Sequence, residues 1–119
     1  MSGTVIVIGA GASQGVGGAL SRKFAAEGHH VIVAGRTDAK VNALAEEVKS
    51  AGGSAEPFVV DVTAAEDQDA LFEHAAGKGE LAAVLYNAGN NAIIPFEQLD
   101  AETFEAFWRV GCLGGFLTA

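Results

Sequence analysis

Residues 4–17 read TVIVIGAGASQGVG, and this stretch decides the fold. The uninterrupted apolar run at residues 5–8 is typical of a short strand covered on both faces of a parallel sheet. Glycines follow at positions 9, 11, 15 and 17, and apolar residues with helical spacing begin at Val16. The stretch therefore predicts a strand that turns through a glycine-rich loop directly into a helix.

Three more apolar runs lie further along the chain, at residues 31–34, 58–60 and 82–86. Because the polarity within each run does not alternate, we expect parallel strands with helices on both faces. The runs alternate with helical patterns, which predicts an α/β fold built on a doubly wound parallel sheet of four strands. No change in composition marks a linker, so residues 1–119 are expected to form one domain.

The first two helices are predicted from their apolar spacing. Val16, Leu20 and Phe24 recur every four residues, and Gly28 follows where a glycine commonly ends a helix. The second helix is expected over residues 41–48, with glycines at 52 and 53 closing it.

The last two helices are predicted from their starting residues. Thr63 and Glu66 form a capping-box pattern at the start of a third helix that ends near Gly77. A fourth helix is expected after Asp100. One side of it carries large apolar residues that we expect to pack in the core or an interface: Phe104, Phe107, Trp108 and Cys112.

Composition excludes several classes of partner. The chain carries 15 acidic and 7 basic residues, a formal charge of −8, and no cluster of lysine and arginine, which argues against nucleic acid or an anionic membrane surface. No apolar run approaches the length of a membrane span or a secretory signal. The single cysteine fits a reducing compartment, so the cytoplasm is the expected location.

The glycine loop has the chemistry of a phosphate cradle. Glycine permits the sharp turn from strand to helix and lets the backbone come close to a pyrophosphate. The following helix N-terminus offers unpaired N–H donors and a partial positive charge. The sequence thus predicts a dinucleotide site at residues 9–17, and a purely structural turn is the alternative.

At these residues the chain resembles the short-chain dehydrogenase/reductase family, whose fold is of the Rossmann type. The family pattern Thr-Gly-x-x-x-Gly-x-Gly falls on residues 10–17, with Ala10 in place of the threonine. A second register places glycines at 9, 11 and 15. The resemblance implies cofactor contacts at Gly11, Ser13, Gln14, Gly15, Val16 and Gly17.

The end of the second predicted strand bears on the choice of cofactor. An acidic group there binds the adenosine ribose of NAD, whereas a basic group accommodates the 2′-phosphate of NADP. Arg36 occupies this place and can offer a charge-assisted fork to a phosphate. NADP is therefore the expected cofactor, although Asp38, more typical of a helix cap, leaves NAD possible.

Two further segments resemble the family. Asp61 and Val62 match a pair in which the aspartate reaches the adenine amino group and the apolar residue packs on the ring. Asn87, Ala88 and Gly89 match the end of the family's Asn-Asn-Ala-Gly segment, with Tyr86 in its first position. The resemblance therefore adds these five residues to the cofactor site.

The family's catalytic serine, tyrosine and lysine have no counterpart in these 119 residues. The only tyrosine, Tyr86, is followed four residues later by Asn90 instead of a lysine. Gly111 stands where the family often carries an asparagine that kinks the fourth helix and serves a proton relay. We therefore assign no catalytic residue, and the spacing of His29, His30 and His74 predicts no metal site.

Three functions remain open at this stage, the last of which is a folding remnant with no ligand function. The first is an NADP(H)-dependent oxidoreductase acting on a carbonyl or alcohol substrate, with this chain as the N-terminal cofactor half of a longer domain. The second is a non-catalytic dinucleotide-binding module that senses or scaffolds. Residues 90–99 could line an apolar substrate pocket or cover the sheet edge. The resemblance also implies a homo-oligomer, because the fourth helix contributes to a subunit interface in the family.

Overall fold

A computed structural model describes residues 3–11, 14–88 and 94–119. Four parallel strands form one sheet in the order β3-β2-β1-β4. Their bounds are β1 Thr4–Ile8, β2 His30–Gly35, β3 Ser54–Val59 and β4 Leu81–Tyr86. The predicted doubly wound α/β fold is confirmed, although β3 begins four residues before the expected apolar run.

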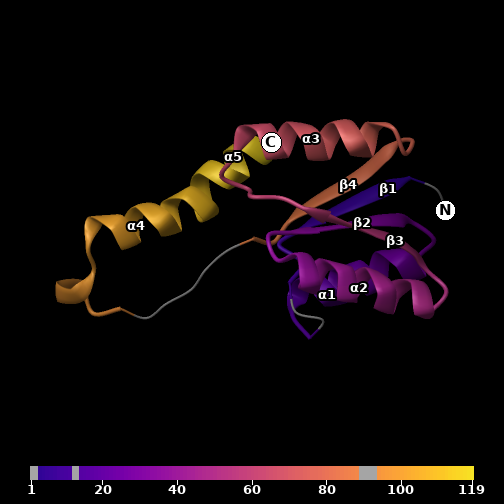
Figure 1. Ribbon diagram of the computed structural model, residues 1–119, viewed down its shortest axis with the longest axis horizontal. Helices are drawn as coiled ribbons and strands as arrows, with labels where there is room; N and C mark the ends of the chain where they lie inside the picture. The colour runs from indigo at the N-terminus through magenta and orange to yellow at the C-terminus, as the bar shows by residue number, and fades with distance from the viewer. Residues whose placement is uncertain (1–2, 12–13, 89–93) are drawn as a thin grey trace.

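Helices cover both faces of the sheet (Figure 1). α1 (Val16–Ala26) and α2 (Asp38–Ser50) pack on the face that carries Val5 and Val7. α3 (Ala65–Ala76) packs on the opposite face, against Ile6 and Ile8. All five residues of β1 are buried because the strand lies between two neighbours and two helical layers. Burying one such valine or isoleucine stabilises the fold by about 1.5–3 kcal/mol.

The residues that α1 buries most deeply lie beside the predicted apolar stripe, of which Leu20 and Phe24 still pack against the core. Its buried residues are small: Gly17, Gly18, Ser21 and Ala25. Val16 is 63% exposed, and Leu20 and Phe24 are only partly buried. The small residues let the helix axis come close to the sheet, which leaves the larger ones at its side. Gly28 follows the helix with φ +93°, as the cap prediction required.

The capping box predicted for α3 is wrong. The helix begins at Ala65 after Ala64, and no side chain caps it. The Thr63 hydroxyl and N–H instead both donate to Asp61 Oδ1, at 2.7 and 2.9 Å. Thr63 thus belongs to a local turn before the helix and does not occupy the N-cap position that a capping box requires.

The fourth helical region is longer and less regular than predicted. α4 (Ala101–Trp108) starts where expected, and Asp100 Oδ1 accepts a 2.7 Å hydrogen bond from Thr103 N. The region continues through a π-helical segment, η2 (Arg109–Leu113), into α5 (Gly114–Thr118). Between β4 and α4 lies the short 3-10 helix η1 (Phe96–Gln98).

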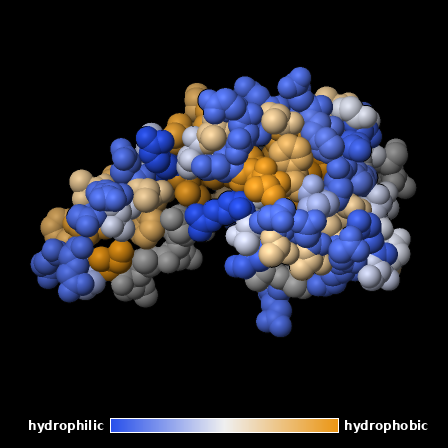
Figure 2. Space-filling model, in the orientation of Figure 1, coloured by the Kyte–Doolittle hydropathy of each residue, from blue (hydrophilic) through white to orange (hydrophobic). Residues whose placement is uncertain are grey.

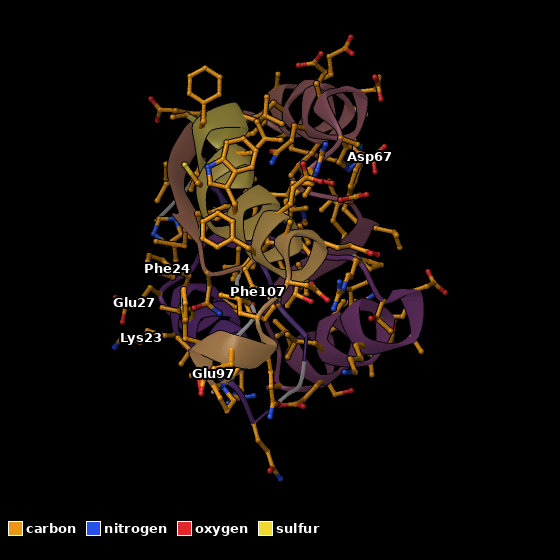
Figure 3. The ribbon with its side chains drawn as sticks, turned by 90° about the vertical axis from the view of Figure 1, so that its left-hand side faces the viewer. Lys23, Phe24, Glu27, Asp67, Glu97 and Phe107 are labelled. Carbon is orange, nitrogen blue, oxygen red and sulfur yellow. The ribbon has the colours of Figure 1, made fainter. Side chains whose placement is uncertain are left out.

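α4 forms an arm that extends away from the sheet, which gives the molecule its extents of 50 × 27 × 21 Å (Figure 1). Figure 3 views the molecule from that end, where Glu97 and Phe107 project. Phe104 is 61% and Trp108 46% exposed, and Cys112 is exposed. These three side chains are therefore not packed in the core of this chain, and their packing in an interface stays a prediction. Figure 2 shows apolar side chains at the surface along the arm.

β4 lies at one edge of the sheet, as expected, and pairs with β1. Leu81 is 40% exposed on this strand. Phe96 belongs to the segment 90–99, which was expected to line a pocket or to cover the sheet edge. Its side chain is 85% exposed, so it neither lines the cavity described below nor covers the edge of the sheet. Among the helices that the structure describes, none is long and apolar enough to cross a bilayer.

A carboxylate shared by two imidazoles joins α3 to the sheet at the amino ends of the strands. Glu56 of β3 has one oxygen 2.6 Å from His30 Nε2 and the other 2.6 Å from His74 Nε2. Lys78 Nζ lies 3.6 Å from Oε2. Burial raises the pKa of Glu56, but the hydrogen bonds from His30 and His74, with the charges of His74 and Lys78, outweigh it and lower that pKa below 4.5.

We expect Glu56→Gln to lower the free energy of unfolding by about 1–3 kcal/mol near pH 6, because the variant loses the charge that three neighbours share. Since the folded-state pKa is depressed, this stabilisation is present above the unfolded-state pKa of 4.5 and is lost as the pH falls through the folded-state value. Urea unfolding of both proteins between about pH 3 and 6 measures the difference.

Glu46→Gln is the matched control, because Glu46 is 72% exposed and pairs only across the helix surface with Lys49 at 2.9 Å. Its effect should stay within about 0.5 kcal/mol. A Glu56→Gln effect that is absent, or that does not change with pH, would show that the shared carboxylate does not stabilise the fold.

Candidate functional site

A cavity of about 300 Å³ opens at the carboxyl ends of the four strands. This is the edge of the sheet at which doubly wound folds bind ligands, beside the strand where the order reverses. Here that strand is β1, which has β2 on one side and β4 on the other. The cavity is lined by Gly9, Ala10, Gly11, Gly35, Arg36, Thr37, Lys40, Val60, Asp61, Val62, Asn87, Ala88 and Val110.

Two glycines let backbone segments meet beneath the cavity. A Cβ on Gly9 would lie 2.6 Å from Ala88 Cα, and Gly9 has φ +89°. A Cβ on Gly17 would lie 2.7 Å from Ala10 Cα. Contacts this short cannot form without movement of the backbone, so only glycine allows the loop after β1 to touch both the loop after β4 and α1.

Gly11 differs from these two glycines because its neighbourhood is open. Among the described residues, the nearest atom to a Cβ built there is Lys40 Cδ, at 3.9 Å. Gly11 lines the cavity, and its φ does not require glycine. The absence of a side chain therefore widens the cavity and is not required by packing. Such an open backbone position is suited to a pyrophosphate.

The N-terminus of α1 lies beyond this backbone. Gly15 is the N-cap, with φ −83° and ψ 178°, and no side chain caps the helix. Its first N–H groups thus keep the partial positive charge that attracts anions. Gln14, Gly15 and Val16 are exposed and do not line the cavity. The predicted contacts Ser13 and Gly89 lie outside the described residues.

One wall of the cavity is basic. Arg36 follows β2, and Lys40 lies four residues later in the first turns of α2. Sequence reasoning identified Arg36 and missed Lys40, whose side chain reaches the cavity from the first turn of α2. Asp38 neither caps α2, whose N-cap is Thr37, nor lines the cavity. Its Oδ1 instead accepts a 3.0 Å hydrogen bond from Asn42 Nδ2.

Asp61 and Val62 form a neighbouring wall, together with Val60, at the end of the adjacent strand β3. The hydrogen bonds from Thr63 hold the pKa of the Asp61 carboxyl below its usual range; burial opposes them, and the charges of Arg36 and Arg109 lower it further. The backbone N–H of Asp61 donates to Asp67 Oδ2 at 2.8 Å, and Asp67 lies on α3 (Figure 3). The Asp61 carboxylate is thus ionised and held in place by its neighbours.

The third wall joins the end of β4 to the π-helical segment. Asn87 and Ala88 contribute from the loop after β4, and Val110 contributes from η2. No sequence signal pointed to Val110, because its place depends on how the irregular helix folds back onto the sheet. Within the part of the chain that the structure describes, no three histidine, cysteine or acidic side chains could hold a metal ion.

The structure therefore gathers six of the predicted site residues around one cavity: Gly11, Arg36, Asp61, Val62, Asn87 and Ala88. Gly17 acts beneath it by allowing close packing. The cavity offers backbone donors, two cations, an ionised carboxylate and apolar walls, and the uncapped N-terminus of α1 follows its glycine loop along the chain. These are the groups that a dinucleotide requires for its phosphates, ribose and rings.

Comparison with known proteins agrees with this geometry. The family model described as short chain dehydrogenase matches residues 4–119. An uncharacterized oxidoreductase of Bacillus subtilis (strain 168) is 37% identical over 112 residues, which cover 92% of this chain and 16% of that protein. A glucose 1-dehydrogenase of Gluconobacter oxydans (strain 621H) is 33% identical over 113 residues, which cover 93% of this chain and 42% of that protein.

Solved structures agree as well. A citronellol catabolism dehydrogenase of Pseudomonas aeruginosa PAO1 superposes with a TM-score of 0.86 at 30% identity, covering 98% of this chain and 47% of that one. A hydroxysteroid dehydrogenase of Escherichia coli superposes with a TM-score of 0.89 at 26% identity, covering 98% of this chain and 48% of that one. The chain thus spans half or less of the length of these relatives. Because the family model matches nearly the whole chain, the protein belongs to the short-chain dehydrogenase family.

Proposed function

We propose that this cavity binds a nicotinamide dinucleotide, with a preference for NADP(H). We also propose that the chain supplies the cofactor-binding half of an oxidoreductase that acts on a carbonyl or alcohol substrate. The observation that carries the proposal is the joining of an open glycine backbone to two cations, Arg36 and Lys40, around one cavity. The names of the relatives, which include dehydrogenases, favour this function over a non-catalytic binding module.

The pyrophosphate would lie against the loop after β1. Gly11 leaves room there, and the uncapped N-terminus of α1 lies next along the chain. Backbone N–H donors and the helix dipole neutralise a diphosphate without needing a lysine or arginine. This explains how a chain with a formal charge of −8 can still hold an anion.

The adenosine end would lie between the basic wall and Asp61. Arg36 and Lys40 can both approach a 2′-phosphate, whose charge is unfavourable beside an isolated carboxylate. Because Arg36 lies near Asp61, it would also balance the charge of that residue. Val60 and Val62 give the adenine ring an apolar neighbourhood. This arrangement supports NADP over NAD.

When bound, the nicotinamide supplies or accepts a hydride; the residues of this chain bind and orient the dinucleotide. Tyr86 does not serve as a proton donor to substrate here, because its hydroxyl donates to the Val110 carbonyl. A cytoplasmic location and assembly into a homo-oligomer stay predictions from sequence.

We expect NADPH to bind more tightly than NADH, and Arg36→Ala and Lys40→Ala each to weaken NADPH about tenfold while leaving NADH nearly unchanged. Each variant removes one charge-assisted contact to the 2′-phosphate. Titration of the intrinsic fluorescence measures the dissociation constants of both dinucleotides for the wild type and for each variant. Lys23→Ala is the control, since Lys23 is exposed on α1 and pairs with Glu27 at 3.1 Å (Figure 3). Tighter NADH binding, or equal losses for both dinucleotides, would contradict the NADP preference.

We expect Gly11→Ala to separate binding from folding. The added methyl group meets no described atom within 3.9 Å, so the free energy of unfolding should change by less than about 0.5 kcal/mol. The same methyl group would occupy the place of a phosphate oxygen and weaken both dinucleotides at least about tenfold.

Gly77→Ala is the matched control for this substitution, because Gly77 has φ −75° and ends α3 away from the cavity. It should change neither dissociation constant. Undiminished dinucleotide binding by Gly11→Ala would exclude the loop after β1 as the pyrophosphate site.

A further inference from the structure

The side chain of Tyr86 connects two walls of the cavity. Tyr86 is the last residue of β4, and its ring packs with Ile6, Ile8 and Val84 on the α3 face of the sheet. Its hydroxyl donates to the backbone carbonyl of Val110, 24 residues away in η2. The residues next to Tyr86, Asn87 and Ala88, line the cavity, as does Val110. One phenol thus bridges the strand side and the helical side of the cavity.

Gly114 leaves the space that this phenol needs. It is buried at the start of α5, and a Cβ built on it would collide with the Tyr86 hydroxyl oxygen. The same Cβ would lie 3.3 Å from Tyr86 Cζ and 3.1 Å from Val62 Cγ2. No side chain larger than hydrogen fits there while the hydroxyl keeps its position. The tyrosine and the glycine are therefore sterically matched.

A buried amide holds the same helix from the other side. Gln68 of α3 is 2% exposed, and its Nε2 donates to the Val62 carbonyl at 3.1 Å and to the Gly114 carbonyl at 3.4 Å. Its Oε1 accepts from Thr118 Oγ1 at 3.3 Å. α5 is thus attached to α3, whereas the π-helical turn that carries Val110 is attached to β4 through Tyr86.

We propose that Tyr86 and Gly114 form a positioning pair that holds the π-helical wall of the cavity at the distance a dinucleotide requires. The identity of the ligand rests on the proposed function, whereas the pair itself rests on the contacts described above. π-helical turns are rare and are found mostly at functional sites, where the altered register re-aims one backbone segment. Here the re-aimed segment is residues 109–113, which places Val110 in the cavity wall.

A double-mutant cycle tests the pair without any ligand. Gly114→Ala should lower the urea midpoint strongly in the wild-type background, because its methyl group meets the Tyr86 hydroxyl. In the Tyr86→Phe background that oxygen is absent, so the same substitution should lower the midpoint much less. If Gly114→Ala alone does not fold, recovery of folding in the double variant is the same result. If the effects of the two substitutions on the urea midpoint simply add, or if the double variant remains unfolded, Tyr86 and Gly114 are not a sterically matched pair.

Dinucleotide affinity tests the positioning role. Tyr86→Phe keeps the ring and removes the bond to Val110, and it should weaken NADPH about threefold to tenfold at a temperature where the variant is folded. Leu71→Val is the control: Leu71 is fully buried on α3, away from the cavity, and its loss of a methylene should lower the urea midpoint without changing affinity.

The outcomes separate the two proposals. NADPH affinity unchanged in Tyr86→Phe, with tight binding by the wild type, would overturn the positioning role and leave the proposed function standing. Equal losses of affinity in Tyr86→Phe and Leu71→Val would also overturn it, since destabilisation alone would then explain both. If the wild type binds neither NADPH nor NADH, the proposed function fails, and the unfolding cycle alone decides whether the pair exists.

Discussion

The contact between the backbone of the loop after β1 and that of the loop after β4 is the constraint on which the rest of the site depends. Gly9 makes it possible, because any Cβ there would overlap Ala88. The contact brings the ends of two adjacent strands together, and the ends of β2 and β3 follow from the parallel register of the sheet. A cavity with walls from all four strand ends is the direct result.

The charged side chains around the cavity are the second feature that favours an anionic ligand. The chain is strongly acidic, yet Arg36 and Lys40 lie together at the cavity, and Arg109 adds to the positive field at Asp61. A few cations in a concave, partly apolar site attract an anion more strongly than the same cations spread over a surface. The net charge of the chain argues against binding to a polyanionic surface, whereas these local cations can attract one phosphorylated ligand.

The fold was predictable from sequence because its strands are apolar throughout and its first turn is rich in glycine. A single four-stranded sheet with helices on both faces is the state in which such runs lose the most contact with water. Gly11, Arg36, Asp61, Val62, Asn87 and Ala88 were found because they follow strand ends, which all meet at one edge. The capping box at Thr63 failed because the Thr63 hydroxyl and N–H both donate to Asp61 Oδ1 in a local turn, and the helix begins only at Ala65.

Other features had no local signal. Val110 reaches the cavity through a π-helical turn that ordinary helical spacing does not predict, and α1 buries small residues where the pattern favoured large ones. Tyr86 and Gly111 looked like two unrelated departures from the family pattern. The structure places them together, since the Tyr86 hydroxyl bonds the carbonyl of Val110, the residue just before Gly111.

The central claim is that a dinucleotide occupies the cavity at the strand ends. Titration of the isotope-labelled protein with NADP⁺, followed through backbone amide resonances, tests it most directly. The account predicts that the largest shifts fall on Gly9, Gly11, Arg36, Val62 and Ala88 and saturate together, while His30 and His74, at the opposite end of the sheet, stay unchanged. Shifts that never saturate, or that centre on the opposite end of the sheet, would contradict it.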